Sequence, residues 1–289
     1  MSWLNAVVQG VLLGGFFAIS ALGLSIVFGV MRIVNLAHGA LMILAAYGSV
    51  LLIERTGLGT WSSLLVVVPV MAALGYLLQR LVLQRAVSIS ELAPLMVTFG
   101  ISIMIPNALV ELFTSDVQAL PTGNLATRSV SAGGIAVGLL PLLTFGIAVV
   151  LIAGLQLFLA RARSGRLMRA AADDSQALRL MGVDNRVVYA QATAIAFATL
   201  ALAGVLFGVR QGGVAPFDGQ VTVLLAFETV IIGGLGSLWG TLVGGIVLGV
   251  TQTLGGEFSP EVPLLVGNLM FLAVLAFRPN GILGRETRA

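Results

Sequence analysis

The sequence predicts an all-α membrane protein, a bundle of eight or nine transmembrane helices that includes short or glycine-broken segments. The first observation behind this prediction is composition: the 289 residues are 58% hydrophobic and only 9% charged. Soluble domains carry about 25% charged residues. A chain this apolar cannot hide its surface in one soluble core, so it is expected to lie in a bilayer.

The second observation is the spacing of the apolar runs. A helix needs about 20 mostly apolar residues to cross a bilayer. Runs of that kind lie near 6–30, 39–53, 61–83, 92–113, 137–160, 187–209, 221–235, 237–255 and 263–277. The segments near 30–55 and 221–255 are short and rich in glycine, which leaves the count at eight or nine. No intervening segment is long enough to fold separately, so residues 1–289 are predicted to form one membrane domain.

The charged residues exclude several classes of function. There is no cysteine, and therefore no disulfide or thiol chemistry. All 15 basic residues are arginine, so the chain cannot supply the lysine of a nucleotide-binding P-loop. The arginines are spread over the loops rather than gathered in a basic patch, which points to membrane orientation and not to nucleic acid.

The arginines also orient the spans. With Arg32 included, 12 of the 15 fall in one set of breaks, which contains the central loop and the C-terminus, and three fall in the opposite set. Because arginine is enriched on the cytoplasmic side, the central loop and the C-terminus are predicted to be cytoplasmic.

The central loop, residues 161–186, holds six arginines and three aspartates. Each charge at mid-bilayer would cost roughly 3 kcal/mol, so the loop must lie outside the hydrocarbon. Asp174 or Ser175 can cap a helix of about two turns that Gly182 ends, and Ala177, Leu178 and Met181 are expected on its apolar face. So short a helix needs a surface to lie against. The alternative is a solvated loop whose arginines anchor lipid headgroups.

The stretch "GRLMRAAADDSQALRLMGVD", which begins at Gly165, resembles the coupling loop of ATP-binding-cassette (ABC) importer permeases, specifically the LivH-type branched-chain amino acid permease family. The resemblance implies a cytoplasmic coupling helix that docks on a separate ATPase. The residues that match the signature are Gly165, Arg166, Arg169, Ala170, Asp174, Ala177 and Gly182.

Four further stretches resemble the same family and extend the likeness over nearly the whole chain. They are the segment around "NLAHG" at 35–39, the span with Thr98, Gly100 and Asn107, the glycine-rich segment from Phe227 to Gly249, and the closing "FRPNGILG". Leu36 stands where the family usually has an aromatic residue, so no stacking role is expected there.

Polar groups and helix breaks at membrane depth usually line a pathway or are paired. The candidate substrate-pathway residues are Asn35, His38, Gly39, Thr98, Glu228, Gly233 and Gly234. The alternatives are structural: His38 as a helix-end residue or a partner of Asn35, and most of the glycines as helix-packing positions. A single histidine is too little for a metal site built from this chain.

The resemblance implies a permease subunit of an importer for branched-chain amino acids or related small solutes in the bacterial inner membrane. It also implies three kinds of protein partner: ABC ATPase subunits that use ATP, a second permease subunit, and a periplasmic substrate-binding protein. Urea, short amides and aromatic acids remain alternative solutes. The alternative function is an ion-coupled secondary transporter built on Arg32, His38, Glu111 and Glu228. An intramembrane enzyme lacks a nucleophile elbow, paired aspartates in the spans and a metal cluster.

Overall fold

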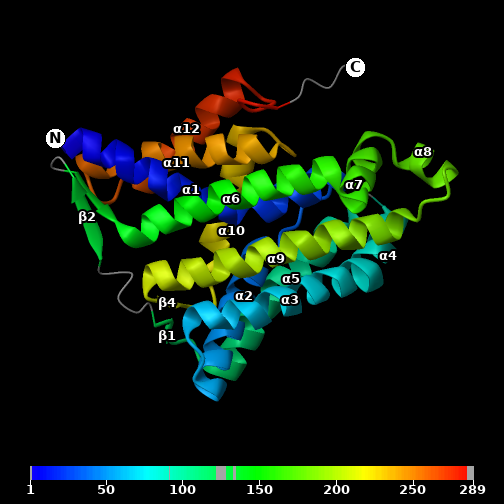
Figure 1. Ribbon diagram of the computed structural model, residues 1–289, viewed down its shortest axis with the longest axis horizontal. Coiled ribbons are helices and arrows are strands. Elements are labelled where there is room, and N and C mark those ends of the chain that lie inside the picture. The colour runs from blue at the N-terminus through cyan, green and yellow to red at the C-terminus, as the bar shows by residue number, and fades with distance from the viewer. Residues whose placement is uncertain (1, 91, 122–127, 133–134, 285–289) are drawn as a thin grey trace. The chain divides into compact units, whose positions relative to one another are not determined.

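The computed structural model describes residues 2–90, 92–121, 128–132 and 135–284, and it is mostly helical (Figure 1). Seven described helices are long and apolar enough to cross a membrane, and two shorter ones are also apolar. They lie where the apolar runs predicted them, which confirms the all-α class. The long ones are α1 (Ser2–Met31), α2 (His38–Thr56), α3 (Thr60–Leu78) with its continuation to Ile89, α5 (Ala93–Phe113), α6 (Leu139–Arg161), α9 (Asn185–Gln211) and α11 (Leu238–Phe258); the shorter ones are α10 (Gly219–Gly233) and α12 (Pro263–Phe277).

The chain divides into two compact units, each assembled from separated segments. Unit 1 comprises Met1–Ser25, Thr122–Ala153 and Leu224–Ala289, and unit 2 comprises Ile26–Pro121 and Gly154–Val223. Three of the four boundaries between the units fall within α1, α6 and α10, and the fourth falls between β1 and β2.

Unit 2 is built around α9, against which α2 and α3 pack, while α5 packs on α2. Gly75 lets α3 approach α9 closely, because a Cβ there would meet Phe197 Cγ at 2.6 Å and Thr193 O at 2.9 Å. One turn later α3 passes into the π-helical turn η1 (Gln79–Leu83), which leads into α4 (Gln84–Ile89). At that turn the buried Thr193 hydroxyl donates to Gln79 Oε1 at 3.0 Å. The apolar pattern did not predict this wide turn.

Short strands add to the helices. In unit 2, β1 (Gln118–Ala119) pairs antiparallel with β4 (Gly213–Val214), so that Gln118 lies opposite Val214. In unit 1, β2 (Ser129–Ala132) pairs antiparallel with β3 (Ile135–Gly138). The Tyr47 hydroxyl donates to Val214 O at 3.3 Å and joins α2 to β4.

Unit 1 contains the glycine-rich helix α11, and the predicted packing role of its glycines is confirmed. A Cβ on Gly244 would overlap Thr229 O of α10, and one on Gly245 would meet Ala18 N of α1 at 3.0 Å. Backbones therefore lie in contact where side chains are absent, as is usual for helices that associate in a membrane. The shorter helix α12 packs on the other end of α11.

Candidate functional site

The central charged segment folds into two helices, one of which the sequence did not predict. These are α7 (Arg163–Asp173) and α8 (Ser175–Leu180), and Figure 1 shows them beyond the neighbouring ends of α6 and α9. Gly165 fits α7 against the last turn of α6, because a Cβ there would meet Leu159 Cα at 2.6 Å and would overlap Phe158 O. Only a glycine permits so sharp a corner without moving backbone.

Two arginines of the coupling signature brace this corner. Arg166 Nη1 donates to Arg161 O at 2.9 Å, and Arg169 Nη2 donates to Ala160 O at 3.3 Å. The last carbonyls of a helix have no partner within the helix, and they carry partial negative charge that a cation stabilises. Both side chains remain exposed. The resemblance implied only an ATPase contact for these two arginines, and no sequence pattern indicated this internal role.

Helix α8 begins and ends as the sequence predicted. Asp174 Oδ1 accepts hydrogen bonds from Gln176 N at 2.8 Å and Ala177 N at 2.9 Å, which makes Asp174 the N-cap. At the other end, Gly182 N donates to Arg179 O at 2.9 Å and Val183 N donates to Leu178 O at 3.3 Å. This is a Schellman motif, and it requires the left-handed conformation that Gly182 adopts at φ +80°.

The predicted apolar face of α8 is wrong in its membership. Leu178 is buried, while Ala177 and Met181 are exposed. Consecutive residues are about 100° apart on a helix, so Ala177 points away from Leu178, and Met181 follows the end of the helix. The outward surface carries Leu180, 90% exposed, and Met181, 79% exposed. With Ala177 they form the α8 tip.

A residue that the sequence analysis missed holds α8 in place. The buried Asn185, at the start of α9, donates from Nδ2 to Ser175 O at 2.7 Å. Asp184 precedes it and caps α9 by accepting from Arg186 N at 2.9 Å. Ala170, the remaining signature residue, is exposed on α7. The short helix is therefore fixed by its N-cap, its C-terminal turn and a bond to the next helix.

Four of the predicted pathway residues come together in unit 2, where α2 begins. Asn35 Oδ1 accepts from Ala37 N at 3.0 Å, and His38 N donates to Asn35 O at 3.3 Å. The buried Thr98 of α5 accepts from Leu36 N at 3.2 Å. The side chains of Asn35 and His38 are buried as well. The "NLAHG" segment is thus a turn that α5 ties to the first turn of α2.

Gly39 brings a second helix to this place. A Cβ on Gly39 would overlap Gly219 O, and a Cβ on Gly219 would meet Gly39 C at 2.7 Å and Ala40 N at 2.8 Å. Gly219 is the first residue of α10, so α2 and α10 begin in backbone contact. We call the group Asn35, His38, Gly39, Thr98 and Gly219 the α2–α10 junction. Gly219 was not among the predicted residues.

The other three predicted pathway residues lie in unit 1. Glu228 of α10 is buried, and its Oε1 accepts a hydrogen bond of 2.8 Å from Asn268 Nδ2 of α12. The Asn268 amide is assigned in this orientation because the opposite one would set oxygen against oxygen; Nδ2 also donates to Leu264 O at 3.1 Å. Glu228 Oε2 accepts no hydrogen bond from the described residues. The sequence located Glu228 but not its partner.

Gly233 and Gly234 form a packed helix end. A Cβ on Gly233 would overlap Gly240 O of α11, and a Cβ on Gly234 would meet Leu283 C at 3.0 Å. The closing "FRPNGILG" segment supplies donors: Ile282 N bonds Ile232 O at 2.8 Å and Leu283 N bonds Gly233 O at 3.0 Å. The C-terminal segment therefore satisfies carbonyls that α10 leaves unpaired where it ends.

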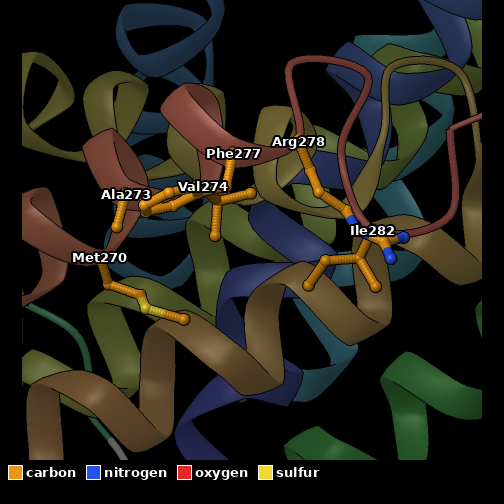
Figure 2. Close-up of a pocket in the computed structure, with 6 residues that line it drawn as sticks. All are labelled: Met270, Ala273, Val274, Phe277, Arg278 and Ile282. Carbon is orange, nitrogen blue, oxygen red and sulfur yellow. The ribbon is translucent and has the colours of Figure 1, made fainter.

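A small pocket of about 220 Å³ lies beside this segment (Figure 2). Its lining is apolar except for one guanidinium: Met270, Ala273, Val274, Phe277, Arg278 and Ile282. A solute site needs a few convergent polar groups among apolar walls, and this pocket does not offer them. Within the described residues no group of three or more His, Cys, Asp or Glu side chains could hold a metal ion.

Comparison with known proteins gives consistent matches along the chain. Residues 6–276 match the family model described as branched-chain amino acid transport system / permease component. The chain is 30% identical to the high-affinity branched-chain amino acid transport system permease protein BraD of Pseudomonas aeruginosa, over 98% of this chain and 96% of that protein. It is 29% identical to LivH of Salmonella typhimurium, with the same coverage, and 28% identical to LivM of Escherichia coli, over 92% of this chain and 67% of that protein. No solved structure matches the chain.

Proposed function

The chain belongs to the branched-chain amino acid transport permease family, and on that premise we propose that it is the transmembrane subunit of an ATP-driven importer in the bacterial inner membrane. Its solute is a branched-chain amino acid or a related small molecule, delivered by a periplasmic binding protein. A second permease subunit completes the path. ATP is used by separate ATPase subunits.

The observation that carries the proposal is the α8 tip. Leu180 and Met181 are 90% and 79% exposed at a segment whose charges keep it out of the hydrocarbon. Exposed apolar side chains on a rigid, polar-rimmed element are typical of an interaction surface. A solvated headgroup-anchoring loop would need neither the Asp174 cap nor the Asn185 bond. We therefore assign the tip to the contact with the ATPase.

The packing of α8 offers a route by which a displacement could reach the spans. It packs on α7 and α9, and α9 in turn packs on α2 and α3. Through Gly165, Arg166 and Arg169, α7 is fixed to the end of α6. Because close-packed elements move as rigid bodies, a push on α8 would move α6 and α9 rather than dissipate in a loop.

The α2–α10 junction is our candidate for part of the substrate path. Two helices begin there, and free N–H groups at helix N-termini favour the carboxylate of an amino acid. Asn35 and His38 add polar groups in a buried setting. Movement of α9, against which α2 packs, would open this place to one side of the membrane. Glu228, Gly233 and Gly234 are better explained by their pairing and packing contacts within unit 1.

The test uses the purified complex with its ATPase. Leu180→Asp and Met181→Asp should weaken ATPase co-purification and abolish uptake into proteoliposomes, because a carboxylate replaces an apolar contact. Ile89→Asp, at a residue 78% exposed on α4, is the matched control and should leave both unchanged. Normal ATPase binding by both tip variants would rule out this docking site. ATP-independent uphill uptake would instead support an ion-coupled transporter.

A further inference from the structure

Helix α5 carries polar residues on a face that no other described part of unit 2 covers. Met96, Gly100, Ile103, Asn107 and Glu111 are all exposed, and their spacing places them on one side of the helix. We call these five residues the α5 face. The opposite side, with Thr98, Ile105 and Leu109, is buried. The sequence singled out Gly100 and Asn107, and neither belongs to the α2–α10 junction.

Lipid is a poor match for the α5 face. Asn107 lies six residues before Phe113, the end of α5, which is roughly 9 Å along the helix axis and inside the hydrocarbon. Its Nδ2 donates to Ile103 O at 2.7 Å within the helix. Its Oδ1 accepts no hydrogen bond from the described residues. A polar atom without a partner costs several kcal/mol in hydrocarbon.

The exposed face of α3, also in unit 2, differs in kind. After the exposed Trp61 and Ser62 of its first turn, the outward residues of α3 are apolar, with Leu65 at 81%, Val70 at 59% and Leu77 at 51% exposed. Such an apolar surface can face the acyl chains of lipid without leaving a polar group unpaired. The α5 face instead combines an amide, a carboxylate and Gly100, where an added Cβ would meet nothing within 4 Å. A bare glycine on an exposed helix allows another helix to approach closely.

We propose that the α5 face is where this permease meets the second permease subunit, so that Asn107 and Glu111 border the solute path between the two chains. This inference rests on the proposed function. Gly100 and Asn107 lie well inside the span, so a periplasmic binding protein or an ATPase cannot reach them. A second membrane-spanning chain, with the water that it encloses, would supply the hydrogen bond that Asn107 lacks there.

The test is site-directed photo-cross-linking in the purified, ATPase-containing complex reconstituted into lipid. A benzophenone amino acid replaces Ile103 or Asn107 on the α5 face, and Val70 or Leu77 on α3 as matched controls. We expect adducts from 103 and 107 to contain transmembrane peptides of a permease chain, and adducts from 70 and 77 to contain lipid. Lipid adducts alone at 103 and 107, peptides of another subunit, or no adduct there would overturn the proposal.

A second variant tests the contact without a probe. Gly100→Leu should lower the affinity between permease subunits about tenfold, which corresponds to ~1.4 kcal/mol, while Gly154→Leu, at an exposed and open position of α6, should not. Native mass spectrometry measures the fraction of complexes that hold two permeases. ATP dependence of uptake by the unmodified complex is scored separately. Loss of ATP dependence would contradict the proposed function, whereas an unchanged fraction of two-permease complexes in Gly100→Leu would contradict only the α5 contact.

Discussion

The bond between Glu228 and Asn268 joins α10 to α12 inside unit 1, and Asn268→Leu should destabilise that unit. The substitution removes the donor of the 2.8 Å bond and leaves Glu228 Oε1 without a partner, beside Oε2, which accepts no bond from the described residues. Stranding a buried acceptor costs about 1–3 kcal/mol. Hydrogen bonds between transmembrane helices contribute about 0.6 kcal/mol on average and up to about 1.7. We expect a loss of about 1–2 kcal/mol.

Two further variants separate the bond from the charge. Glu228→Gln keeps an acceptor oxygen at the same place and should change stability by less than about 0.5 kcal/mol. Replacing both residues, as Glu228→Leu with Asn268→Leu, should cost less than the sum of the two single changes, because apolar partners leave no orphaned group. Such a result would make Glu228 a positioning residue.

The assay is reversible unfolding in mixed detergent micelles, followed by far-ultraviolet circular dichroism for the four members of the double-mutant cycle. Uptake by the Glu228→Gln complex is measured alongside. Additive costs within about 0.3 kcal/mol would refute the bond. A stable Glu228→Gln protein that no longer transports would return Glu228 to the substrate path.

Three other predictions concern the corner between α6 and α7, the end of α8 and the α2–α10 junction. Arg166→Met combined with Arg169→Met should lower the melting temperature in detergent, since two carbonyls of α6 lose their donors at about 0.5–1.5 kcal/mol each; Arg163→Met is the control. Gly182→Val should weaken ATPase co-purification, because a β-branched residue at φ +80° costs about 1–2 kcal/mol, whereas Gly154→Val should not. Gly219→Ala should abolish uptake, because the new Cβ would meet backbone of α2 at 2.7 Å, and an active protein would contradict that contact.

The positions of the helices could be predicted because a bilayer imposes length and apolarity on every span. The ends of α8 could be predicted for a different reason: Asp174 and Gly182 act on backbone groups only a few residues away. Such local effects need no knowledge of the fold. The same holds for the glycines of α11, whose four-residue spacing indicates a packed face.

What could not be predicted depends on contacts between distant residues. Asn268 is the one polar side chain in the apolar run 263–277, but only the arrangement of α10 and α12 places it against Glu228. Arg166 and Arg169 were expected to contact only a partner protein. Their acceptors within the chain are main-chain carbonyls, which every residue has, so the sequence could not indicate them. Gly219 is needed because its backbone lies against Gly39 at the start of α2, a residue that is far away in the sequence.

The bonds from Ile282 and Leu283 to the end of α10 have a consequence for biosynthesis. Unit 1 draws on three separated segments, so its first helix must wait in the membrane until the segment from Leu224 onward has been translated. The carbonyls of Ile232 and Gly233 gain those donors only when residues 282 and 283 have left the ribosome. A stop codon a few residues before Ile282 would therefore yield a chain that contains all the described helices but lacks these two hydrogen bonds at the end of α10.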